Sequence, residues 1–290
     1  MGHVANLRAA GRRDKVVDDP LLNRCGIQVA RTVAARARHA IGRRRPPADA
    51  DVASWVRSLR REGLVVVEDF LATEAFEAVR SAATAALDDP SLPRDHVAPG
   101  DNQLEVVWRS DLDERSRSTL DQLWCEPRLA AIATAAERAS IAPGAGRCTL
   151  QRLVQRAGSD HEAQLHVDTF YPTHKAWLYL TDVDLADGPL RYVARSHRLD
   201  PTVLRAVYRE SVGLNGPSRR IADDEVRARG LRERVLTCTA NTLVVADTSG
   251  YHGRHQGAPG AERVALHLEW RLDPFRRRPM LEEDRSTAIT

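Results

Sequence analysis

The sequence predicts a mainly β protein with flanking helices, in which an antiparallel sandwich or barrel follows a helical amino-terminal part. Two patterns predict this class. From about residue 147 onward, short apolar or alternating segments recur between turn residues, as strands do. Before that point, apolar residues recur mostly at helical spacing. With 290 residues, 42% of them hydrophobic, the chain is long enough to bury a substantial core.

The amino-terminal half is expected to hold helices and one buried strand. The basic segment 21–42 has helical spacing, and the proline-containing segment 43–51 reads as a linker. In order, we expect a helix at 52–63 ending at Gly63, a strand at 64–70, a helix at 73–89 with Thr73 as its N-cap, a loop at 90–102 and a helical region at 115–140.

The carboxy-terminal half is expected to be a β structure with one long interruption. Turn residues separate seven apolar segments, which lie at 148–155, 164–168, 176–183, 189–194, 234–239, 242–247 and 263–272. Residues 198–233 interrupt them as a helix followed by an arginine-rich stretch. Arg219 and Arg220 in this insertion would, in one interpretation, cover a binding site and meet an anionic substrate, although they read first as a solvated charge run.

Charge divides the chain into an extension, a body and a tail. Residues 1–48 carry a net charge of +8, which leaves −5 for the remainder because the whole chain has +3. We therefore expect a basic, helical or partly disordered extension at 1–48, one domain at 49–276 and a tail at 277–290. A nucleic-acid-binding enzyme would carry its positive charge on the body, so this class is disfavoured. The basic helix is expected to rest loosely on the body rather than on a membrane.

The cysteines and the apolar segments favour a cytoplasmic protein. Cys25, Cys125, Cys148 and Cys238 are scattered without a paired motif, as reduced thiols are in the cytosol. The first twenty residues contain no apolar run of signal-peptide length, and no stretch is long enough to span a membrane. The sequence makes no prediction of the oligomeric state.

The stretch QLHVDTFYP, residues 164–172, carries the first candidate metal ligands. His166 and Asp168 stand two positions apart, so in a strand both side chains would lie on one face. About one His-x-Asp motif is expected by chance in a chain of this composition, so the pair needs partners. Two histidines and one carboxylate on one face form a site that leaves metal positions open.

The third ligand is expected from a late strand beside the first two. The later histidines are His174, His197, His252, His255 and His267. Of these, His252 and His255 directly follow the strongly apolar segment 242–247, and the spacing leaves both open.

The last strand contributes a candidate anion-binding group. Arg263, Ala265, His267 and Glu269 alternate with apolar residues and should face the barrel interior. A buried arginine needs an anionic partner, and its own strand offers none next to it. A dicarboxylate cosubstrate would provide one through a bidentate pair.

Together these segments resemble the phytanoyl-CoA dioxygenase-like family of Fe(II)- and 2-oxoglutarate-dependent oxygenases. The resemblance runs from about Leu59 to Pro274. It rests on REGLVVVEDFL (61–71), HVD (166–168), GPLRYVARSHR (188–198), ADTSGYHGR (246–254) and Arg263, which stands eleven residues after His252.

The resemblance implies a double-stranded β-helix, that is, a jelly-roll or cupin-like core, and a set of cofactor-binding residues. His166, Asp168 and His252 would bind Fe(II), and Arg263 would bind the distal carboxylate of 2-oxoglutarate. Trp177 would line the cosubstrate pocket, and Gln151, which shares a strand face with Gln155, could reach it. The eleven-residue step from His252 to Arg263 resembles the spacing in the family, which favours His252 over His255. Ala265 departs from the pattern, since many such enzymes have a polar residue there.

The implied reaction uses O2 and 2-oxoglutarate to hydroxylate an unactivated C–H bond of a small metabolite, with release of succinate and CO2. Halogenating relatives lack the metal carboxylate, so Asp168 favours hydroxylation, and desaturation or cyclisation stays open. The substrate could be an amino acid, an acyl compound or a natural-product intermediate of secondary metabolism. The alternatives are a cupin-type metal-dependent isomerase or hydrolase and a non-catalytic binding protein. Candidate substrate contacts are Thr169, Phe170, Tyr171, His267 and Glu269.

Overall fold

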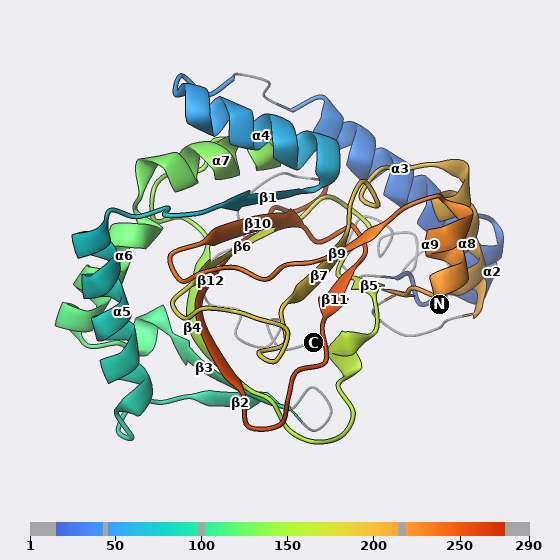
Figure 1. Cartoon of the computed structure of the whole chain (residues 1–290). Coiled ribbons are helices and arrows are strands. Elements are labelled where there is room, and N and C mark those ends of the chain that lie inside the picture. The colour runs from blue at the N-terminus through green and yellow to red at the C-terminus, as the bar shows by residue number, and fades with distance from the viewer. Residues whose placement is uncertain (1–15, 43–45, 98–101, 214–218, 276–290) are drawn as a thin grey trace, which may run out of the picture.

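Two antiparallel sheets face each other at the centre of the molecule (Figure 1). The computed structural model describes residues 16–42, 46–97, 102–213 and 219–275. Within these ranges the larger sheet has seven strands and the smaller sheet has five. The expected class, mainly β with flanking helices and a jelly-roll core, is confirmed.

The larger sheet joins early and late segments of the chain. Its strand order is β1 (Leu64–Val67), β10 (Leu243–Asp247), β6 (His174–Tyr179), β12 (Glu262–Trp270), β4 (Arg147–Val154), β3 (Gln103–Trp108) and β2 (Asp95–Val97). The smaller sheet runs in the order β8 (Arg219–Arg220), β5 (His166–Val167), β11 (His252–Arg254), β7 (Leu190–Val193) and β9 (Glu233–Val235). Strands distant in sequence therefore become neighbours, which brings the 166 and 252 regions together.

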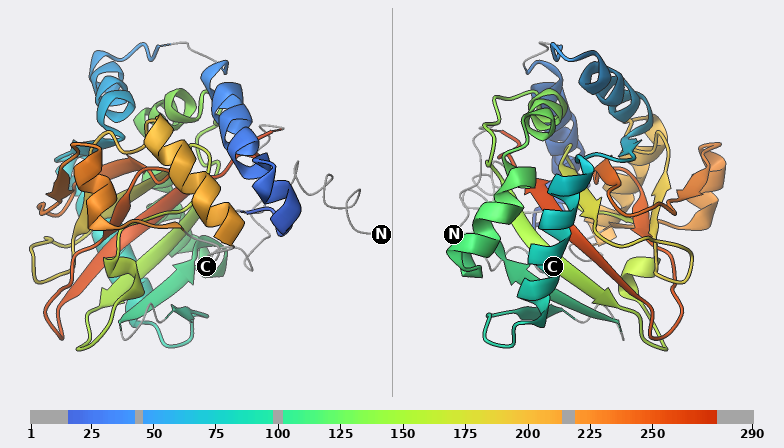
Figure 2. Two further views of the ribbon diagram at one scale, coloured as in Figure 1. Left: turned by 90° about the vertical axis from the view of Figure 1, so that its right-hand side faces the viewer. Right: turned by 60° about the vertical axis from the view of Figure 1, so that its left-hand side comes forward.

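Helices cover both sides of this sandwich (Figures 1 and 2). The larger sheet is covered by α4 (Ala50–Glu62), α5 (Thr73–Asp88), α6 (Glu114–Trp124) and α7 (Pro127–Glu137). The other side carries α2 (Pro20–Arg24), α3 (Ile27–Ala40), α8 (Pro201–Gly213) and α9 (Asp223–Ala228). Two short 3-10 turns, η1 (Arg109–Asp111) and η2 (His161–Ala163), complete the described elements.

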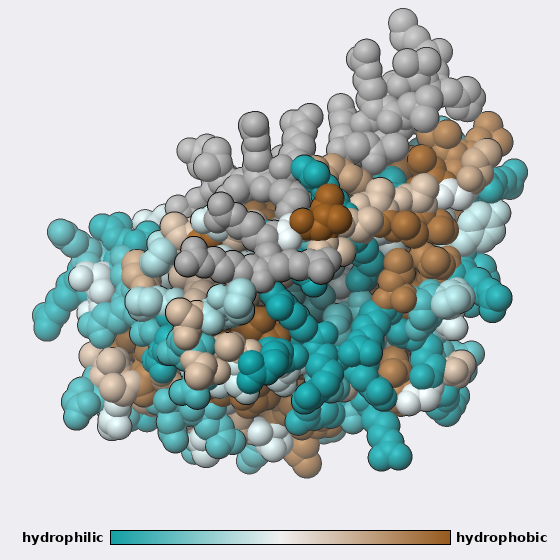
Figure 3. Space-filling model, turned by 90° about the horizontal axis from the view of Figure 1, so that it is seen from above, coloured by the Kyte–Doolittle hydropathy of each residue, from teal (hydrophilic) through white to brown (hydrophobic). Residues whose placement is uncertain are grey.

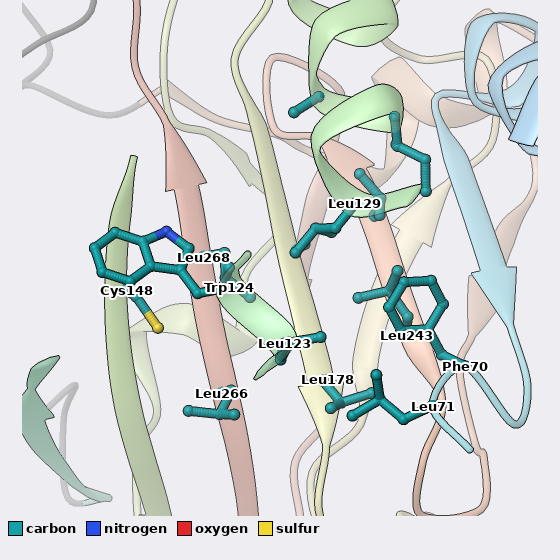
Figure 4. Packing of buried hydrophobic residues seen from close by; sticks show 14 of the residues in the cluster. Phe70, Leu71, Leu123, Trp124, Leu129, Cys148, Leu178, Leu243, Leu266 and Leu268 are labelled. Carbon is teal, nitrogen blue, oxygen red and sulfur yellow. The ribbon is translucent and has the colours of Figure 1, made fainter. Parts of the chain in front are cut away.

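Alternation along β12 separates the core from the cavity. Leu266, Leu268 and Trp270 point outward into a buried cluster with the helices, whereas Arg263 and its alternate neighbours point between the sheets. Figure 4 shows Leu129 of α7 and Leu178 of β6 in this cluster. The predicted orientation of this strand is therefore confirmed. Its apolar side chains face the helices, and its polar side chains face the space between the sheets.

Several local expectations differ from the structure. Ala72, not Thr73, occupies the N-cap of α5, and no side chain caps that helix. The helical region at 115–140 is two helices, because Pro127 begins a second one where the missing N–H of a proline is harmless. The segment expected as a loop before residue 102 contains β2, and β11 is a further strand that the apolar pattern did not reveal.

The amino-terminal helices pack closely on the body. The guanidinium of Arg31 lies 4.6 Å from the ring centre of Phe170, and Arg36 Nη1 donates to the His197 carbonyl at 2.6 Å. Asn23 of α2 donates to the Ser211 carbonyl of α8. The expectation of a loosely resting helix is therefore wrong for this segment. The boundary at residue 48 stays a prediction, and residues 1–15 and the tail 277–290 lie outside the described residues.

The surface seen from above mixes hydrophilic and hydrophobic residues, with the latter gathered toward one side (Figure 3). Three apolar side chains near α2 and α3 are exposed, namely Leu21, Val33 and Ile41. Among the described helices, none combines the length and the apolar character that crossing a membrane requires.

Truncation of the core should destabilise the protein strongly. Leu178 is fully buried between β6 and the covering helices, so Leu178→Ala should lower the free energy of unfolding by about 2–5 kcal/mol. Leu185 has 55% exposure, so Leu185→Ala should change it by less than about 0.5 kcal/mol. Urea unfolding followed by circular dichroism measures both, and equal losses would contradict this view of the core.

Candidate metal centre

The pairing of β5 with β11 sets two imidazoles side by side. His166 and His252 are direct partners in this antiparallel pair, and their ring centres lie 4.4 Å apart. Asp168 follows β5, and its backbone N–H donates to the Thr248 carbonyl at 3.0 Å. This hydrogen bond fixes the backbone at Asp168, just after β5, in a position from which its carboxylate reaches the two imidazole rings.

His166, Asp168 and His252 form a candidate metal site. One ligand atom from each lies within 4.8 Å of the others, and no other such group occurs among the described residues. Asp168 Oδ1 is 3.8 Å from His166 Nε2 and 3.6 Å from His252 Nε2. Two imidazoles and one carboxylate that leave positions open are typical of non-haem iron(II) sites. His255 is not part of the group.

Backbone carbonyls orient both imidazoles. His166 Nδ1 is 2.9 Å from the Gln164 carbonyl oxygen, and His252 Nδ1 is 3.0 Å from that of Gly250. A carbonyl only accepts, so each Nδ1 carries a hydrogen, and Nε2 is the nitrogen that is left to bind a metal. This arrangement fixes the tautomer that metal binding needs.

Asp168 is held as a carboxylate. Burial alone would raise its pKa, but Lys175 and the two imidazoles outweigh burial and hold the pKa well below its usual range. Lys175 Nζ lies 2.8 Å from Asp168 Oδ2. The ligand is thus deprotonated in advance of metal binding.

A cavity of about 430 Å³ lies between the sheets and includes the metal site. Such a volume suits a small ligand together with a cosubstrate. The β3 part of its wall is apolar, with Leu104, Val106 and Trp108, whereas β4 contributes mainly polar and charged side chains. The lining includes Leu104, Val106, Trp108, Arg147, Thr149, Gln151, Leu153, Glu162, Lys175, Trp177, Tyr179, Arg220, Arg254, Arg263, His267 and Glu269.

Arg263 offers an unpaired cationic group to this cavity. Its Nη1 is buried and has no hydrogen-bond partner among the described residues. The guanidinium lies 5.7 Å from the ring centre of Tyr179, and burial lowers the pKa of Arg263 from its ordinary value. A buried guanidinium without an anionic partner is a binding site for the carboxylate or another anionic group of a ligand.

The other residues expected to contact the cosubstrate or substrate divide into two groups. Trp177, Gln151, His267 and Glu269 all line the cavity. The rings of Trp177 and His267 have centres 5.4 Å apart, and burial with the nearby Lys175 lowers the pKa of His267 to about 3. His267 is therefore a neutral imidazole. Glu269, by contrast, is paired with cations, with Arg147 Nη1 at 3.2 Å.

Thr169, Phe170 and Tyr171 do not line this cavity. Phe170 and Tyr171 pack with Ala35 of α3 and with Phe275, on the other side of the metal-binding strand. Thr169 donates to the Tyr171 carbonyl at 2.6 Å and borders a separate cavity of about 70 Å³ beneath α3 and α8. The strand ends at Val167, and the chain beyond Asp168 packs against α3 instead of lining the cavity.

Sequence reasoning missed two charged groups at the site. Lys175 gave a weak signal as one of only two lysines in the chain. Glu162 gave no signal in the sequence, because it lies on the short turn η2 and not on a strand that lines the cavity. Its Oε2 lies 3.0 Å from His166 Nε2, and this imidazole outweighs burial and lowers the pKa of Glu162 to about 2. A metal ion on His166 would displace that contact.

Comparison with known sequences decides the family. A family model described as phytanoyl-CoA dioxygenase (PhyH) matches residues 59–240, which is more than half of the chain. The chain belongs to the phytanoyl-CoA dioxygenase family. It is therefore an enzyme that depends on iron and 2-oxoglutarate. The matched residues include His166 and Asp168. His252 and Arg263 lie beyond the matched range, and the structure shows that both line the same cavity. Among curated proteins, no sequence matches the chain.

Solved structures share the fold of this phytanoyl-CoA dioxygenase family member. The epimerase SnoN, in complex with Fe3+, alpha ketoglutarate and nogalamycin RO, is 18% identical with a TM-score of 0.51, covering 76% of this chain and 83% of that one. EctD from S. alaskensis, with 2-oxoglutarate and 5-hydroxyectoine, is 17% identical with a TM-score of 0.50, covering 79% and 82%. At these identities the likeness concerns the fold alone.

Loss of either histidine should abolish metal binding. His166→Ala and His252→Ala each remove an oriented Nε2, so the affinity for Co(II) should fall by more than about a hundredfold, beyond the usual effect of an outer partner. Isothermal titration calorimetry measures this affinity. His255→Ala is the control and should keep the wild-type value. An equal loss in His255→Ala would mean that the third ligand has been misassigned.

Proposed function

We propose that the protein hydroxylates an unactivated C–H bond of a small metabolite, with His166, Asp168 and His252 as the iron ligands and Arg263 as the anchor of 2-oxoglutarate. The observation that carries the assignment is the unpaired guanidinium of Arg263 in the same cavity as the three-ligand group. Bound iron and 2-oxoglutarate supply the oxidising power for this reaction, and succinate and CO2 are released.

The cavity suits these two groups. The three ligand atoms match an iron site in type and spacing, Asp168 is a carboxylate, and the carbonyls on both Nδ1 atoms leave Nε2 for the metal. Arg263 is a bidentate donor without a partner, which fits a distal carboxylate. Ala265, although it departs from the pattern of many relatives, lies beside Arg263 and adds no group that would block that carboxylate.

The remaining lining residues position the reactants and exclude water. Tyr179 lies beside Arg263 and Trp177 beside His267, and both rings restrict the room around the cosubstrate. Gln151, whose Nε2 donates to Thr149 Oγ1 at 3.2 Å, lies two strands from Tyr179 in the same row and offers its amide to the cosubstrate. Neutral His267 provides a hydrogen-bonding group without adding charge.

Charge on the lining supports an anionic substrate. Five lining side chains are cationic, namely Arg147, Lys175, Arg220, Arg254 and Arg263, and three are carboxylates, namely Glu162, Asp168 and Glu269. Iron(II) and 2-oxoglutarate carry opposite charges of equal size, so the loaded cavity keeps an excess of positive charge. A small substrate with a carboxylate or phosphate would neutralise this excess.

Turnover of 2-oxoglutarate tests the proposed function. Purified protein with Fe(II), O2 and 2-oxoglutarate should form succinate, even when the reaction is uncoupled from substrate. Arg263→Met should weaken 2-oxoglutarate binding by about thirtyfold or more, because removing one partner of a buried charge pair costs at least about 2 kcal/mol. Arg80 is exposed on α5, so Arg80→Met is the matched control. Absence of both succinate and 2-oxoglutarate binding would leave the isomerase, hydrolase or binding-protein alternatives.

A metabolite screen tests the substrate class. Carboxylated or phosphorylated metabolites should stimulate succinate formation with a KM at least about tenfold below that of their neutral amide or ester counterparts. Mass spectrometry of the product then separates hydroxylation, which adds one oxygen, from desaturation, cyclisation or epimerisation, which do not. Neutral compounds that serve equally well would contradict the charge argument.

A further inference from the structure

Lys175 stands out in a chain that otherwise uses arginine. Of 43 basic residues only Lys15 and Lys175 are lysines. Lys175 lies on β6, faces the cavity and approaches a metal-ligand carboxylate. An ammonium is a compact point charge, whereas the broad guanidinium fork engages both oxygens of a carboxylate. A lysine here can contact one oxygen and leave the other free.

The two oxygens of Asp168 have different neighbours. Oδ1 faces both imidazoles at 3.6 and 3.8 Å, whereas Oδ2 lies 2.8 Å from Lys175 Nζ. The side chains of Lys175 and Asp168 have only 18% and 15% exposure, so water competes weakly for this contact. An ion pair of this length holds Oδ2 beside the ammonium and leaves Oδ1 toward the site.

Lys175 is itself fixed by a second carboxylate. Glu269 Oε1 lies 3.8 Å from Nζ, and Glu269 is almost fully buried. Arg271 Nε, just after β12, lies 2.8 Å from this carboxylate, and Arg147 Nη1 of β4 lies 3.2 Å from it. Burial disfavours the ammonium, but Asp168 and Glu269 outweigh it and raise the pKa of Lys175. The ammonium therefore sits in a rigid, charge-compensated frame.

We propose that Lys175 is a positioning residue that restricts Asp168 to binding the metal through one oxygen. A carboxylate that bound through both oxygens would take up a position that 2-oxoglutarate or O2 requires. The ammonium on Oδ2 prevents this and keeps the open positions open. The inference rests on the proposed function for its consequence, while its geometric part concerns only the ligand and the lysine.

The metal-only form tests the geometric part. Co(II) bound to protein absorbs visible light less strongly as its coordination number rises. Lys175→Met frees Oδ2, so its Co(II) complex should absorb more weakly than that of the wild type. Lys175→Leu, which also lacks any donor, should shift the absorption in the same direction, and it serves if circular dichroism shows that Lys175→Met is misfolded. Arg80→Met removes an exposed charge on α5, outside the cavity, and should keep the wild-type spectrum. Unchanged spectra in the folded lysine variants would overturn the proposal.

Calorimetry tests the consequence. In Lys175→Met the Kd for 2-oxoglutarate on the metal-loaded protein should rise about tenfold, as for loss of an outer partner, while the Kd for the metal should not rise. Weakening of both would identify Lys175 as a mere support of the ligand and overturn the proposal, as would an unchanged Kd for 2-oxoglutarate. If the wild type itself does not bind 2-oxoglutarate, the proposed function fails, and the Co(II) spectra still decide the role of Lys175.

Discussion

The direct pairing of His166 with His252 across β5 and β11 is the constraint on which the site depends. It places the two imidazole rings next to each other. The carbonyl two residues before each histidine contacts Nδ1, which leaves both Nε2 atoms available to the metal site. The flanking sheet and helices keep this short pair in place, since β5 alone has only two residues. A two-residue strand carries no stability of its own. The metal centre is therefore a product of the whole sandwich.

Much of the fold and the metal site could be predicted from the sequence because both depend on local periodicity. The alternation along β12 places Arg263 and Glu269 in the cavity and Leu266 in the core, and the structure agrees. The alternation lies within one strand, where side-chain direction follows from secondary structure alone. The choice of His252, which the structure brings to Asp168, comes from its spacing to Arg263, which resembles that of the family.

What could not be predicted depends on where segments end and on which loops meet. Strand β5 stops at Val167, and for that reason Phe170 and Tyr171 enter the layer beneath α3 rather than the cavity. Glu162 reaches His166 from η2, and no periodic pattern signals such a contact. The basic character of segment 21–42 predicted a helix that packs loosely on the body. In the structure, Arg31 stacks on Phe170 and Arg36 donates to the His197 carbonyl.

Strand β8 gives the long insertion a structural role at the metal site. Arg220 and Arg219 pair with His166 and Val167, and the Ile221 backbone N–H donates to the Leu165 carbonyl at 2.7 Å. The segment 198–233 is thus the edge partner of the strand that carries a metal ligand. Exchanging this segment between relatives, as a designer of chimaeric enzymes would do to alter selectivity, removes that edge. A graft that preserves β8 keeps the ligand strand enclosed on both sides, whereas one that omits it leaves an iron ligand at an open sheet edge.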